Sequence, residues 1–289
     1  MDKKNNRYKE MKDITTLKYY EVTEKNPVMM KLETSKRKKL YHYTNEIGAK
    51  GILKSNKLWV THSNFLDDKT EIKYISSVLD GVIMYLNQNK ELYDMGITGQ
   101  VYVYEAIIKT LEALRETYKE GAPISGANLF LLSLTENKKN KYLIENYCRQ
   151  GGAVLEFRNN IHDMFKENSH IYPIFSAKVV YDFAEQMTLI LEDINEFYLE
   201  LLNNLINEKT IDYMEMIETV KSIITIKIIN YSFFFKDIKF YKEEEYRIVF
   251  LVSEDYNDKF VKYRTKSAKE IPYIEVNFKK KSLIKTRFI

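Results

Sequence analysis

The sequence predicts an α+β fold in which a β-rich core carries an inserted helical layer. Short runs of strand-forming residues occur near the beginning, in the middle and at the end of the chain, and the stretches between them repeat apolar residues with a helical period. The longest helical stretch runs from about 182 to 230. Neither a low-complexity linker nor an internal repeat separates these parts. We therefore expect one α+β domain over 38–289 with a helical insertion, preceded by a polar arm over 1–37.

The composition is that of an ordinary globular protein. The chain has 289 residues, of which 45% are hydrophobic and 30% charged, with a formal net charge of +4. No apolar run is long enough to span a bilayer and the first residues lack the apolar core of a secretory signal, so we expect no membrane partner. Cys148 is the single cysteine, which excludes an intrachain disulfide and favours a cytoplasmic setting. The glycine motifs of P-loop ATPases and Rossmann dehydrogenases are both absent.

The first strand leads directly into a helix. Leu40–Thr44 is a strand-forming run that presents His42, Tyr43 and Thr44. Asn45 is a good N-cap for the apolar helical pattern that follows. The sequence thus places a histidine and an aromatic ring where a strand meets a helix amino terminus, a position at which enzymes often hold nucleotide-like ligands.

The other elements follow in chain order. Strands are predicted at 57–61, 129–135, 153–157, 171–181, 246–252, 260–264, 273–276 and 284–289. Helices are predicted at 70–89, 100–118, 139–149 and 182–230, the last broken near 209–210. The apolar stripe of the last helical region is typical of core packing.

An acidic cluster, Glu243–Arg247, is predicted to start a late strand. The pleat would place Glu243, Glu245 and Arg247 on one face. Two carboxylates so close repel each other, and Arg247 can serve as their cation. The cluster is either a solvent-facing strand end with its own counterion or a carboxylate aimed into a cleft. In the second case it could bind a sugar hydroxyl and stabilise a cationic transition state.

A second acidic cluster lies at Asp67, Asp68 and Glu71. Asp68 as N-cap with Glu71 at the third helical position is close to a capping box, and acids are favourable at a helix amino terminus. A divalent metal site is the alternative, which His62 and Asn64 are near enough to join. No zinc-type spacing of ligands supports that alternative.

Basic residues gather in two places. The run 36–39 comes just before the first strand and is either a solvated strand entry or a phosphate contact. The tail over 279–287 holds four lysines and one arginine. Together with the many tyrosines, this tail could support nucleic-acid binding.

Taken together, these motifs resemble a bacterial family of unknown function, the domain of unknown function numbered 2971. The matching segments, in chain order, are Tyr41-His42-Tyr43-Thr44, Gly51-Ile52-Leu53, Leu58-Trp59, Leu66-Asp67-Asp68-Lys69-Thr70-Glu71, Ser133-Leu134-Thr135, Tyr147 with Gly151-Gly152, and Glu243-Glu244-Glu245-Tyr246-Arg247. The match covers about residues 38–289. Asp67 stands where the family usually has Asn, and Thr135 where Ser is common.

The order of a His-aromatic strand, a Ser/Thr strand and a late Glu strand is also similar to that of ADP-ribosyltransferases. This resemblance implies a split β-sheet core around an NAD cleft, with helical insertions. It implies that NAD is bound as a substrate by an ADP-ribosyltransferase or NAD glycohydrolase, of the kind that serves as a bacterial toxin or phage-defence effector. The acceptor would be a protein or a nucleic acid.

The same resemblance assigns roles to individual residues. His42 would bind a ribose hydroxyl of NAD, and Tyr43 or Tyr147 would stack on the nicotinamide ring. Glu245 would be the catalytic carboxylate, which is expected to face His42 across one cleft.

Four further residues complete the expected site. Thr44 and Ser133 would belong to the NAD-binding part, and Arg247 would favour the ionised form of the catalytic carboxylate. Glu243 would orient or deprotonate the acceptor as a general base.

Two alternatives stay open at this point. The first is a metal-dependent nuclease with Asp67, Asp68, Glu71 and Glu243 as oxygen ligands. The second is a nucleic-acid-binding or partner-binding module without catalysis, which would use the basic tail.

Overall fold

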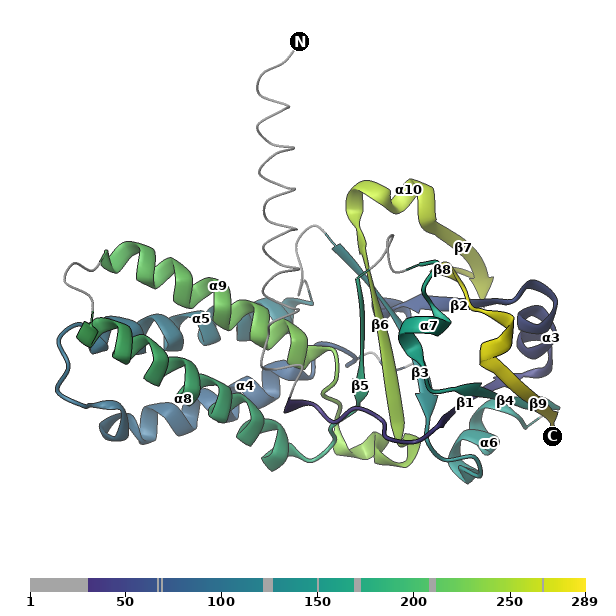
Figure 1. The fold of residues 1–289 in the computed structure, drawn as a ribbon, viewed down its shortest axis with the longest axis horizontal. Coiled ribbons are helices and arrows are strands. Elements are labelled where there is room, and N and C mark those ends of the chain that lie inside the picture. The colour runs from purple at the N-terminus through teal and green to yellow at the C-terminus, as the bar shows by residue number, and fades with distance from the viewer. Residues whose placement is uncertain are drawn as a thin grey trace, which may run out of the picture. The chain divides into compact units, whose positions relative to one another are not determined.

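A computed structural model describes residues 31–289, except 67, 69, 122–126, 150, 169–172, 208–211 and 267. Most of the expected polar arm therefore lies outside the described residues. The chain forms two compact units (Figure 1). The helical unit contains 77–116 and 187–231 together with Lys31 and Leu32, and the sheet unit contains 33–76, 117–186 and 232–289.

The helical unit is built on four long helices. They are α4 (Ile75–Gln88), α5 (Gln100–Glu120), α8 (Phe183–Asn207) and α9 (Tyr213–Ser232), with a short 3-10 helix at Lys90–Tyr93. A buried ion pair joins α8 to α9, since Asp193 lies 3.2 Å from the Lys227 ammonium and also accepts a hydrogen bond from Tyr231. The stretches predicted as helical from apolar periodicity are helices in the structure, although their ends differ from those predicted. The predicted break near 209–210 lies outside the described residues.

The sheet unit contains nine strands, four α-helices and four 3-10 helices among its described residues. The strands are β1 (Lys39–Asn45), β2 (Lys57–His62), β3 (Ala127–Thr135), β4 (Gly152–Arg158), β5 (Ile174–Lys178), β6 (Glu245–Ser253), β7 (Val261–Lys266), β8 (Lys269–Asn277) and β9 (Leu283–Phe288). The α-helices are α3 (Glu46–Ser55), α6 (Lys141–Tyr147), α7 (Ile161–Met164) and α10 (Asn257–Phe260), and the 3-10 helices are Ser63–Phe65, Ile238–Glu243, Glu254–Tyr256 and Lys280–Ser282. The predicted α+β class is confirmed.

The sheet forks at β3. One edge of β3 pairs antiparallel with β6 over its whole length, from Ala127–Ser253 to Thr135–Glu245. The other edge is divided, because Leu131 pairs with Thr61 of β2, whereas Thr135 pairs with Tyr41 of β1. One prong continues as β2-β8-β7 and the other as β1-β4-β9 (Figure 1). The sheet therefore continues as two separate prongs on this side of β3.

Alternation along the strands gives the sheet a main buried face. Residues two apart on β3 and β6 point to the same side, so Leu132, Leu134, Tyr246 and Ile248 join one large apolar cluster. The opposite face carries a small cluster between β1, β4 and α6, made of Tyr41, Tyr43, Leu143, Cys148 and Val154. Cys148 is thus buried as a small apolar residue, as the sequence predicts.

The turn from β1 into α3 forms as its residues predict. The Asn45 side chain accepts a 2.7 Å hydrogen bond from the Gly48 backbone N–H and caps the helix. Gly152, at the start of β4, has room for no side chain, because a Cβ there would lie 2.6 Å from Cys148 Cα and 2.7 Å from the Thr44 carbonyl oxygen. This close approach fixes the end of β1 against the end of α6.

Candidate functional site

Three predicted site residues meet at the fork. His42 on β1 places Nδ1 3.1 Å from the Ser133 carbonyl oxygen on β3, and the Ser133 hydroxyl donates a 2.7 Å hydrogen bond to Glu245 Oε1 on β6. Ser133 is exposed although Leu132 and Leu134 beside it are buried. His42, Ser133 and Glu245, which we call the fork row, are therefore linked by hydrogen bonds across three neighbouring strands, with the exposed Ser133 at the centre.

The hydrogen bond of His42 defines its chemistry. A carbonyl oxygen can only accept, so Nδ1 must hold the proton and donate it to Ser133. Burial lowers the pKa of His42, and the hydrogen bond to the Ser133 backbone opposes this to a smaller extent. The ring is therefore neutral near pH 7, and its Nε2 is an acceptor for a ligand hydroxyl.

Glu245 is an ionised carboxylate held in a buried network. Arg247 binds it with two hydrogen bonds, from Nε to Oε1 at 2.8 Å and from Nη2 to Oε2 at 2.9 Å. Burial alone would raise the pKa of Glu245, but the charges of Arg247 and Lys236, with hydrogen bonds from Arg247 and Ser133, hold that pKa well below its usual range. The carboxylate thus keeps its negative charge although it is only 3% exposed.

Lys236 and Glu71 complete this network. The Lys236 ammonium lies 2.7 Å from Glu243, 3.3 Å from Glu71 and 3.4 Å from Glu245. The other carboxylate oxygen of Glu71 lies 2.8 Å from Arg247 Nη1. Burial raises the pKa of Glu243, and attraction by Lys236 opposes this. Its affinity for a proton is therefore above that of an ordinary glutamate.

The expected cap role of Glu71 is wrong. Helix α4 begins at Ile75, so Glu71 lies in the preceding turn and its side chain points into the ion network. Asp68 accepts hydrogen bonds from the backbone and hydroxyl of Thr70 and shapes this turn. The Glu71 side chain thus pairs with the buried cations Lys236 and Arg247 and does not cap the helix as the local sequence predicts.

The predicted strand start is also displaced. β6 begins at Glu245, Glu243 ends a 3-10 helix, and Glu244 between them has a left-handed φ of 47°. The pleat therefore does not place the Glu243 side chain beside that of Glu245. The two carboxylates meet instead through Lys236.

The residues of the metal-site alternative are described only in part. Across the described part of the chain, no group of three or more His, Cys, Asp or Glu side chains is placed to hold a metal ion. Asp67 lies outside the described residues. His62 accepts a hydrogen bond from the Asn64 backbone, and its Nε2 lies 3.0 Å from the Asn128 amide oxygen.

Tyr43 packs against α6. Its ring is buried in the small cluster against α6, and burial raises the pKa of its hydroxyl. That hydroxyl donates to the Asn137 carbonyl at 2.8 Å and accepts from the Asn140 N–H at 3.1 Å. Tyr43 therefore braces the start of α6, and its ring surface is not open for stacking. Tyr147 is exposed at the end of α6, and Thr44 is half-buried at the end of β1.

Replacing Tyr43 with Phe is expected to lower the free energy of unfolding by roughly 1–2 kcal/mol, because the change leaves a backbone donor and a backbone acceptor without their partner. Urea unfolding followed by circular dichroism would measure this. Tyr241→Phe, at an exposed tyrosine, is the matched control. Equal stabilities of the two variants would contradict the bracing role.

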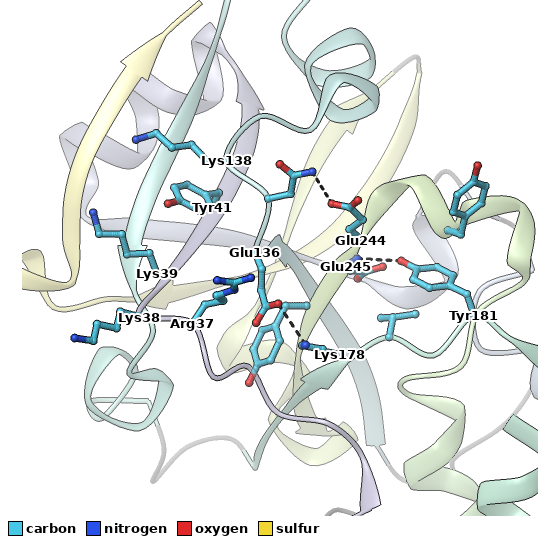
Figure 2. A pocket seen from close by; sticks show the side chains of 14 residues that line it. Arg37, Lys38, Lys39, Tyr41, Glu136, Lys138, Lys178, Tyr181, Glu244 and Glu245 are labelled. Atoms are coloured by element: carbon cyan, nitrogen blue, oxygen red, sulfur yellow. Dashed lines mark hydrogen bonds and ion pairs between the residues drawn. The ribbon is translucent and has the colours of Figure 1, made fainter. Parts of the chain in front are cut away.

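A cleft of about 840 Å³ opens where β3 ends and β6 begins. Figure 2 shows Arg37, Lys38, Lys39 and Lys138 on one side of it, with Glu244, Glu245 and Tyr181 opposite. The Tyr181 hydroxyl accepts a hydrogen bond from the Glu245 backbone at 3.1 Å. Glu245 lines this cleft but His42 does not, so the two residues do not face each other across it as expected. The two residues are joined through Ser133 instead.

One wall of the cleft has an excess of positive charge. Lys39 and Lys138 share the single carboxylate of Glu156, while Arg37 and Lys38 are exposed. The run 36–39 therefore reaches a cleft, as the phosphate-contact interpretation requires. Guanidinium and ammonium groups arranged in this way can bind phosphate oxygens.

Lys236 is the residue that sequence reasoning missed. It joins all three carboxylates of the network, from a loop that is close in sequence to Glu243 and Glu245 but far from Glu71. The available signal was its position directly after Phe233, Phe234 and Phe235, all of which are fully buried. A lone cation that follows such a run is poorly placed to reach solvent.

Comparison with family models gives a match over part of the chain. A family model described as "Protein of unknown function (DUF2971)" matches residues 145–248, which supports the resemblance to that family. The matched segment contains Glu243, Glu245 and Arg247 and begins after His42 and Ser133. No curated protein and no solved structure matches the chain.

None of the helices in the described ranges is long and apolar enough to cross a membrane.

Proposed function

We propose that the sheet unit is an NAD-dependent ADP-ribosyltransferase or NAD glycohydrolase. The observation that supports this best is the fork row, in which a neutral histidine, an exposed serine and an ionised glutamate come from three neighbouring strands. Sequence order alone led to the same three residues.

The chemistry suits an ionised carboxylate. When the bond between nicotinamide and ribose breaks, its electron pair leaves with nicotinamide and the ribose carbon acquires oxocarbenium-like positive charge. Glu245 supplies fixed negative charge near that carbon, and Ser133 orients the carboxylate. Water or an acceptor hydroxyl then bonds to the same carbon and gives up a proton. Glu243, whose pKa is raised, is the nearby group suited to take it.

The other parts of NAD have matching partners. His42 Nε2 would accept a hydrogen bond from a ribose hydroxyl, which the neutral tautomer permits. Arg37 and Lys38 at the basic wall would bind the diphosphate. The volume of the cleft, about 840 Å³, falls in the range of cofactor sites.

Incubation of the purified protein with millimolar NAD is the direct test. Release of free nicotinamide, measured by chromatography, is the expected result, with ADP-ribose appearing free or on an acceptor. Absence of NAD binding in calorimetry at the same concentration would overturn the proposal.

Ser133→Ala is expected to lower kcat for nicotinamide release roughly 10-fold with little change in KM, because the carboxylate loses the hydroxyl that orients it. Stability should hardly change, since Ser133 is exposed and the ion network stays intact. Ser253→Ala, at the far end of β6, is the matched control. A kcat equal to that of the control would argue against a role for Ser133.

Binding of nucleic acid without catalysis is the second candidate, favoured by the exposed Arg37 and Lys38 at the basic wall. It predicts binding of single-stranded RNA that weakens steeply with salt and survives the loss of Glu245. The tail contributes less than its sequence indicates, because Lys279 and Lys281 are both paired with Asp163.

A further inference from the structure

The prong formed by β2, β8 and β7 presents a face opposite to the main apolar cluster. Leu58 and Val60 of β2 belong to that cluster, so Trp59 between them, the only tryptophan of the chain, points to the opposite face. Residues directly opposite each other on antiparallel strands share one side of the sheet. Strand register therefore gathers six residues on this surface, which we call the tryptophan face: Lys57, Trp59, Tyr273, Glu275, Lys262 and Arg264.

The indole ring of Trp59 is held in place and stays half open. Tyr273 packs against it with ring centroids 4.6 Å apart and an angle of 31° between the rings. The Arg264 guanidinium lies 5.8 Å from both ring centroids and is itself fixed by a 3.0 Å hydrogen bond to the Thr61 hydroxyl. Tyr273 is buried, whereas Trp59 is 49% exposed. A rigid aromatic surface of this kind is preorganised for stacking.

The same face has a large excess of positive charge. At the described positions of its three strands it carries Lys57, Lys262, Arg264 and Lys269, and its one carboxylate there is Glu275. Lys57 and Lys262 both pair with Glu275, at 2.8 and 2.9 Å, from the strands on its two sides. A single carboxylate cannot neutralise these cations, so the face attracts an anionic partner.

We infer that the tryptophan face binds single-stranded nucleic acid, with an unpaired base stacked on Trp59 and the flanking phosphates on Lys57 and Lys262. Every base has a flat surface that can cover an indole ring, so such stacking tolerates any sequence. In a duplex the bases are stacked on one another, and the ring can be used only by an unpaired strand. The described lining of the cleft includes none of these residues, so the inference does not depend on the proposed NAD chemistry.

The single tryptophan gives a readout of this face alone. Titration of the purified protein with oligothymidylate at low salt is expected to quench the fluorescence of Trp59 strongly, because a base covers the ring. Duplex DNA of the same length and polyglutamate should leave the fluorescence nearly unchanged, since neither presents an unpaired base. Absence of quenching by oligothymidylate, or equal quenching by polyglutamate, would overturn the inference.

Trp59→Ala should weaken the binding of labelled oligothymidylate, measured by fluorescence anisotropy, roughly 10-fold, because one stacked base loses its partner. Trp59→Phe should restore most of the affinity. Tyr263→Ala, at an exposed tyrosine on the other side of β7, is the matched control, and circular dichroism checks that each variant is folded. Equal affinities of Trp59→Ala and Tyr263→Ala would show that no base stacks on Trp59.

Lys262→Ala should lower the slope of log affinity against log salt concentration by about one, because one phosphate contact is lost. Lys54→Ala is the control, since Lys54 is exposed on α3, which packs on the main apolar cluster at the other side of the sheet. A slope equal to that of the control would contradict the phosphate contact.

A double variant, Arg37→Ala with Lys38→Ala, separates the tryptophan face from the basic wall of the cleft. Binding and quenching of Trp59 that persist in this variant support the inference. Loss of binding in this variant, together with normal binding by Trp59→Ala, would place the nucleic acid on the basic wall and refute it. Release of nicotinamide from NAD should be equal in the wild type and Trp59→Ala, so each proposal can fail without the other.

Discussion

Glu245→Gln is expected to lower the rate of nicotinamide release at least about 10³-fold, the largest effect of any substitution considered for activity. Glutamine keeps the shape of the side chain and can still accept from Ser133, but it removes the negative charge. The charge matters most in the transition state, because that is where the ribose carbon becomes positive. We therefore expect the loss in kcat, measured by single-turnover release, with NAD affinity altered much less.

Glu254→Gln is the matched control, since Glu254 is exposed just beyond the other end of β6. Glu245→Gln also removes one of the carboxylate partners of Arg247 and of Lys236, so its fold must be checked by circular dichroism and by NAD binding. A folded Glu245→Gln protein that releases nicotinamide within about two-fold of the control rate would refute the catalytic role, because charge loss at such a site costs far more.

Arg247→Met is expected to lower the free energy of unfolding by roughly 3–5 kcal/mol, the largest effect on stability, because it breaks a buried ion network from one side. Arg247 is only 1% exposed and binds Glu245, Glu71 and the Phe233 carbonyl. Without it, two buried carboxylates depend on Lys236 alone. Methionine fills similar volume, so the loss is electrostatic rather than a cavity effect. Urea unfolding measures it.

The pH dependence of this effect has a definite sign. The pKa of Glu245 is lowered in the folded protein, so its contribution to stability is present above the pKa of an unfolded glutamate, about 4.3, and is lost as pH falls further. The difference between wild type and Arg247→Met should shrink below that pH. Arg158→Met, at an exposed arginine of β4, should cost no more than about 0.5 kcal/mol. Equal losses in the two variants would contradict a stabilising network.

Local signals predicted much of the fold. The strand-to-helix junction at Asn45 formed as expected because an N-cap acts within one turn of its own helix. Runs of apolar residues located β3 and β6 because both strands are buried at successive positions over most of their length. Both signals depend on neighbours in sequence, which the sequence displays directly.

The features that were not predicted depend on distant partners. The local sequence predicts that Glu71 caps a helix, but its side chain pairs with Arg247 and Lys236, which follow more than 160 residues later. Glu243 lies outside the strand because Glu244 adopts a left-handed backbone conformation. Non-glycine residues seldom adopt this conformation, so the sequence does not predict it. The fork depends on β3 exchanging one strand partner for another along one edge.

The buried network holds three carboxylates, Glu71, Glu243 and Glu245, against two cations, Lys236 and Arg247, and therefore one negative charge in excess when all are ionised. The cleft wall formed by the residues just before β1 and just after β3 has the opposite sign, from Arg37, Lys38 and their lysine neighbours. The negative network and the positive cleft wall together form an electric dipole. A zwitterion with a pyridinium at one end and a diphosphate at the other would be rotated into alignment by this field before it touched any side chain, so capture should slow as salt rises.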